Sequence, residues 1–381
     1  MLQILEATIG GTKRHLLDLC TGLDPAQFDV LVACPRVRSE ARGDVSFVDD
    51  LTRAGIAVRI VPMVRAISPA RDVAAAVRLA ALVARGGFDV IHAHSSKAGF
   101  LGRQAALLSP RSKVVYSPHG FYFQNFSSPL RRGLFKALEK AAAFRTDALI
   151  ALSRGEYDAA VKGGLVPRGR AKLVRNGIEH AECLPRAEAR RRLGIDPTAV
   201  VVGTISRFTP QKAPLDLVDA VEELARERPD LVFAWFGDGE LRARVEARIQ
   251  SRGLAASFRI FGYRPDAREL LPALDLFVLA SRWEGLPYTI LEAMDAGVPA
   301  IATDVVGSQD VIEDGRNGRL VPFGRPDLLA RAAGDLLKNP IRLAELSLIA
   351  REDVLRRYSR ASMVKEIASL YVDLAMGVRV G

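Results

Sequence analysis

Two glutamates in the second half of the chain form its most informative chemical pattern. Glu284 and Glu292 lie in the segment SRWEGLPYTILEAMDAG, the first in a predicted loop and the second about one turn into a helix that begins near Tyr288. Two carboxylates could supply the acid and the nucleophile of glycoside hydrolysis. Their placement favours a different use, because carboxylates accept hydrogen bonds from sugar and ribose hydroxyls while the free amides of a helix start hold a phosphate.

A cationic pair lies earlier in the same half. Arg207 follows a predicted strand in VVVGTISRFTPQKAPLDLVDA, and Lys212 precedes the next helix. Arginine offers a fork of donors and lysine a compact charge, so the two would neutralise a diphosphate. A solvated charged loop is the alternative. Together with Glu284 and Glu292, the pair would clasp one nucleotide sugar.

Three histidines follow predicted strands in the first half. His92 and His94 lie in HAHSSKAG, and His119 lies in SPHGF. Two histidines at this spacing could bind zinc, but no third ligand of a motif type stands nearby, so we expect histidines at a cleft wall and no metal. His119 is predicted to reach a sugar or phosphate oxygen. Lys97 begins the next helix and could meet an anionic acceptor or be solvated.

A glycine pair follows the first predicted strand. Gly10 and Gly11 precede the helical run TKRHLLDL, where the backbone could approach a ligand and the helix start would favour an anion. The pattern is not G-x-G-x-x-G, so a dinucleotide fingerprint is absent. A tight structural turn explains the pair equally well.

These candidate residues are positioned by short apolar runs that alternate with helix-length amphipathic segments. The alternation is typical of βαβ units on parallel sheets and predicts an α/β protein with two Rossmann-like, doubly wound domains. Ligands of such folds bind beyond the carboxyl ends of the strands, so we expect the domains to face each other across a cleft. The predicted strands cover residues 2–7, 28–34, 57–61, 90–93, 114–117, 148–151 and 172–174, then 200–205, 231–236, 258–261, 276–279 and 300–303.

The composition is that of a soluble globular protein. The 381 residues are 49% hydrophobic and 26% charged, which excludes disordered and collagen-like chains. Apolar stretches are interrupted before the roughly 20 residues that a membrane span needs, and the start MLQILEATIGG lacks a basic leader. Three widely spaced cysteines argue against a disulfide framework and favour the reducing cytoplasm.

The net charge of +10 lies entirely in the first half of the chain. Residues 1–185 hold 26 Lys and Arg against 16 Asp and Glu, whereas residues 186–381 hold 28 of each. This asymmetry suits an anionic membrane surface or a phosphorylated substrate, although a merely solvated basic surface is an equal alternative. Nucleic acid is not expected, because no helix-turn-helix, zinc-finger or RNA-binding aromatic signature is present.

One basic segment has the pattern of an amphipathic helix. In PLRRGLFKALEKAAAFR, residues 129–145, Leu130, Leu134 and Leu138 recur every four residues among basic side chains. The favoured interpretation is a helix docked on its own domain with its basic residues in water. A peripheral position on an anionic membrane is the alternative.

Several motifs, taken in order, resemble the retaining glycosyltransferases of family 4, which have the two-domain GT-B fold. They are Gly10-Gly11, NGIE at 176–179, Arg207 with Lys212, FGDGE at 236–240 and E-G-L-P-x4-E-A-M at 284–294. HAHSSKAG and SPHGF are most similar to the branch that builds bacterial surface polysaccharides on a polyprenyl diphosphate lipid. The resemblance implies an acceptor-binding domain at 1–185, a nucleotide-sugar domain at 186–360 and a helix at 361–381 that returns to the first domain.

The resemblance also implies roles for matching residues. Arg207 and Lys212 would stabilise the departing nucleoside diphosphate, Glu284 would hold donor sugar hydroxyls and His119 would line the reaction centre. Pro287 and Ala213 depart from glycines that are common in the family. The remaining implied contacts are Gly11, Gly237, Tyr263, Gly285, Leu286 and Glu292 with the donor, and Gly10, Lys97 and His119 with the acceptor.

A front-face reaction is the expected mechanism, in which the leaving phosphate takes the acceptor's proton and the clamp stabilises its charge. The sequence contains no Asp-x-Asp, so metal independence is expected and no cofactor is implied. The implied donor is a uridine diphosphate sugar, and the implied location is the cytoplasm or the inner face of the plasma membrane. A sugar-nucleotide epimerase of the same architecture and a non-catalytic module for anionic ligands are the alternatives.

Overall fold

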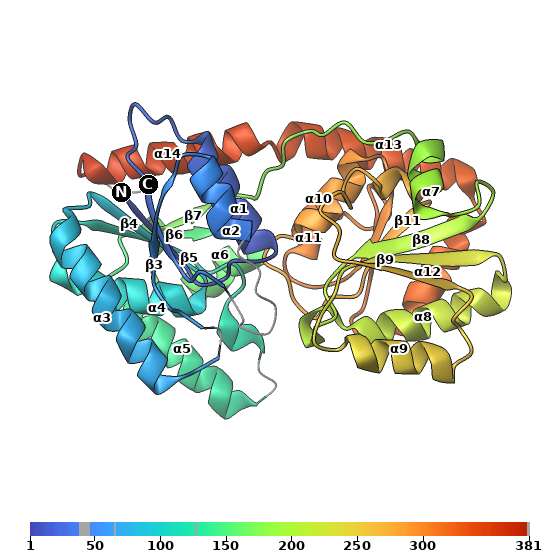
Figure 1. Ribbon diagram of the computed structural model, residues 1–381, viewed down its shortest axis with the longest axis horizontal. Coiled ribbons are helices and arrows are strands. Elements are labelled where there is room, and N and C mark those ends of the chain that lie inside the picture. The colour runs from blue at the N-terminus through green and yellow to red at the C-terminus, as the bar shows by residue number, and fades with distance from the viewer. Residues whose placement is uncertain (38–45, 65, 126–127, 379–381) are drawn as a thin grey trace. The chain divides into compact units, whose positions relative to one another are not determined.

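The computed structural model describes residues 1–37, 46–64, 66–125 and 128–378 (Figure 1). The chain forms two compact units. Unit 1 comprises Met1–Gly177 together with Arg360–Gly381, and unit 2 comprises Ile178–Ser359. Each unit is an α/β structure around one parallel sheet, as the alternation of apolar and amphipathic segments predicts.

The sheet of unit 1 has seven strands in the order β3-β2-β1-β4-β5-β6-β7. All neighbouring strands run parallel. Chain order reverses between β1 and β4, which are direct neighbours, so the loops after these two strands meet at the switch point of the fold. The strands are β1 (Leu2–Leu5), β2 (Leu31–Cys34), β3 (Ala57–Ile60), β4 (Val90–His94), β5 (Lys113–Ser117), β6 (Ala148–Ala151) and β7 (Ala171–Leu173).

The helices of unit 1 pack against this sheet and against one another. Helix α4 contacts both α3 and α5, and the last helix, α14, packs against α1 and β4. The core of this last contact includes Leu19, Val90, Ile367 and Tyr371. The helices are α1 (Gly11–Gly22), α2 (Ser46–Arg53), α3 (Pro69–Gly86), α4 (Ser96–Ala105), α5 (Pro129–Ala143), α6 (Arg154–Lys162) and α14 (Arg360–Ala375).

Unit 2 repeats the same topology with six strands in the order β10-β9-β8-β11-β12-β13. Its switch point lies between β8 and β11, which are paired in parallel. The strands are β8 (Val200–Ile205), β9 (Leu231–Phe236), β10 (Phe258–Gly262), β11 (Leu276–Leu279), β12 (Ala300–Thr303) and β13 (Arg319–Val321), and the helices are α7 (Arg186–Leu193), α8 (Pro214–Glu227), α9 (Arg242–Ser251), α10 (Tyr288–Asp295), α11 (Ser308–Val311), α12 (Pro326–Leu337) and α13 (Pro340–Arg357).

The predicted strands coincide with observed ones, and one observed strand was missed. Strand β13 (Arg319–Val321) has only three residues, and it joins the sheet by pairing with β12. Such a short strand is held by its neighbour in the sheet and leaves no alternating pattern in the sequence.

The structure divides the chain after Gly177, whereas the sequence places the boundary after residue 185. Ile178 already belongs to unit 2, because its amide donates to the Tyr358 carbonyl at 2.8 Å. The amide of Leu184 donates to the Glu269 carbonyl, which ties the rest of this segment to the same unit. Among the described residues, no helix is both long enough and apolar enough to cross a lipid bilayer.

Candidate functional site

The cationic pair and the first glutamate of unit 2 meet at its switch point. Arg207 and Lys212 follow β8, and Glu284 follows β11, the strand that pairs with β8. The Nζ atom of Lys212 lies 2.5 Å from Oε1 of Glu284, and both side chains are largely buried. The fold therefore brings together a cation and a carboxylate that the sequence predicts to bind a donor, although they are far apart in the sequence.

Gln211 links the two loops that carry these residues, and sequence reasoning did not find it. Its side-chain NH2 group donates to the main-chain carbonyl of Trp283 at 3.0 Å. The main-chain carbonyl of Gln211 accepts from the main-chain amide of Arg282 at 2.8 Å. Its Oε1 accepts a 3.4 Å hydrogen bond from Arg207. Its position in the sequence between Arg207 and Lys212 was the one feature that could have indicated its role, because its side chain is neutral and does not stand out as a charged residue does.

The loop of Gly285 and Leu286 leads into α10, with Pro287 at the residue before the helix. The side chain of Leu286 is buried, and Glu292 lies within α10 and is partly buried. Gly307, at a φ of 88°, backs this loop so closely that a Cβ atom there would lie 2.5 Å from the Gly285 carbonyl oxygen. The position of the glutamate loop therefore depends on a glycine in the loop after β12.

Two further predicted donor contacts also lie at strand ends of unit 2. Gly237 follows β9 with a φ of 146°, and a Cβ atom there would lie 2.1 Å from the Ser206 carbonyl oxygen. This glycine therefore allows the backbone after β9 to approach the backbone after β8. Tyr263 follows β10 with an exposed side chain.

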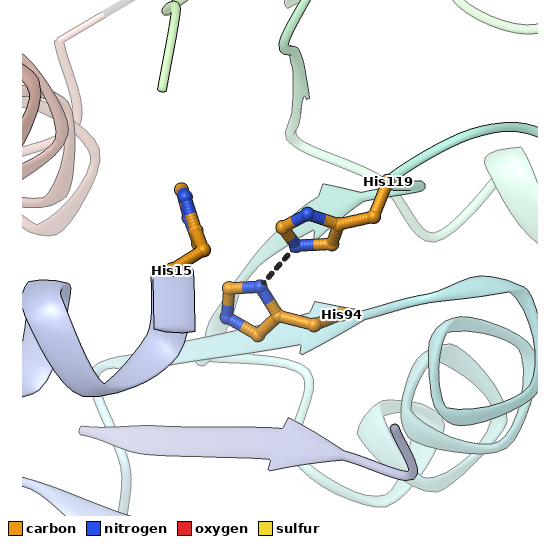
Figure 2. Close-up of side chains that lie close together, drawn as sticks. All are labelled: His15, His94 and His119. Atoms are coloured by element: carbon orange, nitrogen blue, oxygen red, sulfur yellow. Dashed lines mark hydrogen bonds between the residues drawn. The ribbon is translucent and has the colours of Figure 1, made fainter. Parts of the chain in front are cut away.

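Four of the five histidines gather at the switch point of unit 1. His92 and His94 belong to β4, His119 follows β5, and His15 comes from α1, the helix that begins at the glycine pair. Figure 2 shows the rings of His15, His94 and His119 converging, with a 3.0 Å hydrogen bond between Nδ1 of His94 and Nε2 of His119. The rings of His92 and His94 lie 3.8 Å apart between centroids.

Burial keeps these imidazoles neutral. It lowers the pKa of His15 to about 4, although a hydrogen bond to Asn176 opposes the shift. Burial and the neighbouring imidazoles hold the pKa of His92, His94 and His119 well below the usual value of 6.5. The cluster can therefore donate and accept hydrogen bonds at neutral pH, but it brings no positive charge to an anionic substrate.

In the structure, His15 is the third histidine near His94 and His119, which no sequence motif indicated. One nitrogen each of His15, His94 and His119 lies within 4.8 Å of the others. Sequence spacing could not reveal His15, because the loops after β1, β4 and β5 meet only through the parallel sheet. The hydrogen bond between His94 and His119 needs a hydrogen on one of the two facing nitrogens, whereas metal ligation needs lone pairs on all three.

Lys97 is neither solvated nor open to an anion in this structure. Its ammonium donates to Asp72 of α3 at 2.6 Å and to the Ala66 carbonyl at 2.5 Å. The nearby carboxylate of Asp72 therefore already neutralises the cation that the sequence offered to an acceptor. Gly10 and Gly11 are exposed at the start of α1, and Gly10 has a φ of 76°, a left-handed conformation that favours glycine.

Each half of the chain matches a known glycosyltransferase sequence profile. Residues 9–182 match the profile described as Glycosyltransferase Family 4, and residues 185–353 match the one described as Glycosyl transferases group 1. UDP-Gal:alpha-D-GlcNAc-diphosphoundecaprenol alpha-1,3-galactosyltransferase of Escherichia coli is 28% identical over 98% of this chain and 96% of that protein. EpsD of Bacillus subtilis strain 168, which carries a glycosyltransferase name, is 30% identical over 74% of this chain and 76% of its own length.

Solved structures share the fold at lower identity. A complex of Anabaena HepE with UDP and glucose superposes with a TM-score of 0.82 at 22% identity, covering 98% of this chain and 99% of that one. Sucrose-phosphate synthase from Thermosynechococcus elongatus gives a TM-score of 0.83 at 20% identity, covering 99% of both chains. Both the sequence profiles and the fold agree with the resemblance of the motifs, and this chain belongs to the family 4 glycosyltransferases with the GT-B fold.

Proposed function

We propose that this protein transfers a hexose, with retention of anomeric configuration, from a uridine diphosphate sugar to a hydroxyl of a polyprenyl diphosphate-linked saccharide in surface polysaccharide synthesis. The name of the Escherichia coli relative specifies UDP-Gal and a diphosphoundecaprenol acceptor, and Anabaena HepE binds UDP-glucose in its crystal. The observation that carries the proposal is the contact of Lys212 with Glu284 at the switch point of unit 2.

Lys212, Glu284 and their neighbours have different roles in the proposed reaction. One N–H of the Lys212 ammonium meets Glu284, which leaves two for phosphate oxygens, and Arg207 adds its planar fork. Glu284 accepts hydrogen bonds from donor sugar hydroxyls, and Glu292 accepts one from the ribose. The backbone of Gly285 and Leu286 lies beside the donor, where the start of α10 favours an anion.

The reaction proceeds on one face of the sugar. The acceptor oxygen bonds to the anomeric carbon as the bond to the phosphate oxygen breaks, and that phosphate oxygen takes the acceptor's proton. The cations stabilise the charge that develops on the leaving group, so no divalent ion is required. His119 lines the reaction centre on the acceptor side.

The test is nucleotide release measured with and without a lipid-linked acceptor, followed by NMR of the product linkage. Release that depends on the acceptor, with the anomeric configuration of the donor sugar retained in the product, supports the transferase. Interconversion of sugar nucleotides without acceptor would identify an epimerase, and binding without turnover would identify a ligand-binding module. Loss of activity in EDTA with rescue by a divalent ion would contradict metal independence.

We propose a second, peripheral contact with the inner face of the plasma membrane. The leucines of α5 are not packed on unit 1: Leu130, Leu134 and Leu138 are 84%, 57% and 40% exposed. The helix instead buries Glu139 and Ala142, and Glu139 pairs with Arg103 at 2.6 Å. The favoured interpretation, a helix docked on its own domain with its basic residues in water, agrees with these contacts, but the three leucines do not form the docked face.

The basic residues of α5 indicate which kind of surface its exposed leucines would bind. Arg131, Arg132 and Lys140 are exposed on the same helix, so apolar and basic side chains are offered to solvent together. This combination suits a bilayer that contains anionic lipids, where leucines enter the interface and basic residues meet headgroups. A lipid-linked acceptor would be presented at the same surface.

A further inference from the structure

We infer that Gln3, His94 and Tyr371 are positioning residues that fix His119 as the tautomer with hydrogen on Nε2, so that its Nδ1 accepts a hydrogen bond from a hydroxyl of the bound sugars. The inference rests on the proposed function, because it assigns a role to His119 in binding the substrates. The three residues come from β1, β4 and α14, which meet only in the folded unit. None of them belongs to the motifs that carry the donor site.

The relay begins at Tyr371 on the last helix. The Nε2 of Gln3 donates to the hydroxyl of Tyr371 at 3.1 Å, and both side chains are buried. This bond turns the carbonyl oxygen of Gln3 toward His94, whose Nε2 lies 2.7 Å away. A carbonyl can only accept, so Nε2 of His94 carries the hydrogen.

The same reasoning carries the hydrogen to His119. His94 is fully buried and neutral, so a hydrogen on its Nε2 leaves a lone pair on Nδ1. That lone pair lies 3.0 Å from Nε2 of His119, which must therefore be the donor. His119 is also neutral, so its Nδ1 keeps a lone pair, and Figure 2 shows this nitrogen on the side of the ring away from His94.

His15, which packs beside His119, is itself held as one tautomer. Its Nδ1 lies 2.9 Å from the carbonyl oxygen of Asn176, so this nitrogen is the donor and Nε2 holds a lone pair. Within the described part of the chain, Nε2 of His15 has no hydrogen-bond partner. The rings of His15 and His119 lie 4.7 Å apart between centroids. His15 is therefore a neutral neighbour of His119 with a fixed tautomer of its own, while the lone pair of His94 places the hydrogen on Nε2 of His119.

The backbone holds the His119 ring in place. His119 has a φ of 53°, a left-handed conformation that is costly for a residue with a Cβ atom. Glu156 supports the turn, because it accepts from the Gly120 amide and, at 2.8 Å, from the Leu152 amide. The ring is thus fixed by its backbone on one side and by His94 on the other.

The direct test is nitrogen NMR of the full-length protein labelled in its five histidines. The wild-type protein should show His119 protonated at Nε2 and unprotonated at Nδ1. Gln3→Met removes the carbonyl acceptor at similar volume, so His94 and His119 should become tautomer mixtures. Gln3→Glu keeps an acceptor and should preserve the wild-type tautomers. Ser117→Ala is the comparison variant, because it removes the 2.8 Å partner of His92 but none of the hydrogen bonds that join Gln3, His94 and His119. His92 also contacts the Tyr371 hydroxyl at 2.5 Å, so the effect of this variant should not exceed that of Tyr371→Phe.

Activity gives a second measurement. Gln3→Met should lower kcat roughly ten- to a hundredfold, the range seen when an outer partner that orients a histidine ligand is removed. Gln3→Glu should recover the rate at neutral pH and move the acidic limb of the pH profile to higher pH, because its carboxylate favours protonated His94. Tyr371→Phe should give a smaller loss, since Gln3 remains but is less firmly oriented.

Three results would overturn the relay. They are a wild-type His119 protonated at Nδ1, unchanged tautomers in Gln3→Met, and stoichiometric Zn²⁺ binding that shifts all three facing nitrogens. Each is read from the protein alone, so failure of the relay is distinguishable from failure of the proposed transfer reaction. An inactive protein with the expected tautomers would count against the reaction and leave the hydrogen-bond network established.

Discussion

In the proposed reaction Lys212 binds the leaving phosphate, and in the structure it also forms a buried ion pair. Its ammonium lies 2.5 Å from Glu284, and both side chains are largely buried at the switch point of unit 2. Removal of one partner of a buried pair leaves the other charge without compensation, which costs more than loss of an exposed pair. The rate and the stability of this site are therefore separable by substitution.

We expect Lys212→Met to lower kcat about 10²- to 10³-fold, because the leaving phosphate loses a positive donor. The same change should destabilise unit 2 by up to about 3 kcal/mol, because Glu284 keeps a buried charge. The double variant Lys212→Met/Glu284→Gln should recover stability but not rate. Steady-state kinetics measures the first effect, and urea unfolding followed by tryptophan emission measures the second, since Trp235 and Trp283 both belong to unit 2.

The control for this pair is Lys338→Met, which removes an exposed contact with Glu227 in the same unit. Its effect on stability should be much smaller than that of Lys212→Met, because the exposed pair is screened by solvent, and its kcat should be unchanged. Arg207→Ala should reduce kcat without the stability loss of Lys212→Met. Full activity in both Arg207→Ala and Lys212→Met would contradict the clamp.

At the scale of elements, the loop after β12 determines where the glutamate loop lies. Gly307→Ala would place a Cβ atom 2.5 Å from the Gly285 carbonyl oxygen at a positive φ. We expect the loop of Glu284 to shift, with a rise in the donor KM, a fall in kcat and a loss of stability of about 1–3 kcal/mol. Donor titration and urea unfolding measure these effects.

Gly324→Ala separates crowding from backbone strain. Gly324 has a similar φ of 74°, but a Cβ atom there would meet no atom within 4 Å. It should therefore cost about 1 kcal/mol from the left-handed conformation alone and leave the donor KM unchanged. Equal kinetic effects of the two alanines would show that the contact with Gly285 does not position the site.

Helix α5 provides the second prediction at this scale. The variant Leu130→Ser/Leu134→Ser should reduce sedimentation with vesicles of anionic lipid, because exposed apolar area is lost from the proposed membrane face. Leu348→Ser in α13 is the control, since Leu348 is 73% exposed but belongs to unit 2. Binding to anionic vesicles should fall with added salt. Equal wild-type binding to neutral and anionic vesicles would contradict the charge component of the proposal.

At the scale of the whole molecule, the histidine cluster should make the stability of unit 1 depend on pH. The folded pKa of His15 is about 4, and those of His92, His94 and His119 are also lowered. Below about pH 6.5 the unfolded chain therefore binds more protons than the folded one, so stability falls as the pH falls. Each histidine contributes a slope of up to about 1.4 kcal/mol per pH unit.

Hydrogen exchange can follow this loss in each unit separately. Between pH 7 and pH 5, protection of the β1, β4 and β5 amides, corrected for intrinsic exchange, should fall more than protection of the β8, β9 and β11 amides. Unit 2 is the internal control, because His180 is its one histidine in the sequence. Parallel loss in both units would contradict the assignment to the cluster.

The sequence by itself determined the two parallel-sheet units, and it predicted which residues of unit 2 form a donor motif. Strands are short apolar runs whose periodicity is local, and strands β8, β9, β11 and β12 begin and end at the predicted residues. Arg207, Lys212 and Glu284 were found because charged residues next to strand ends stand out from an apolar background. The placement of each near a strand end followed from the same local pattern.

Only the tertiary structure decided which of these residues meet. The partners of Gln3 lie at residues 94 and 371, and His15 reaches the other histidines because β1 and β4 are neighbours in the sheet. Neither spacing nor composition encodes those distances. Lys97 and the leucines of α5 show the same limit, since the ion pairs Lys97–Asp72 and Arg103–Glu139 join residues that are distant in the sequence. The periodicity of a strand or helix is set by residues that are near one another in the sequence. The residues of a site are instead brought together by the order of the strands in the sheet.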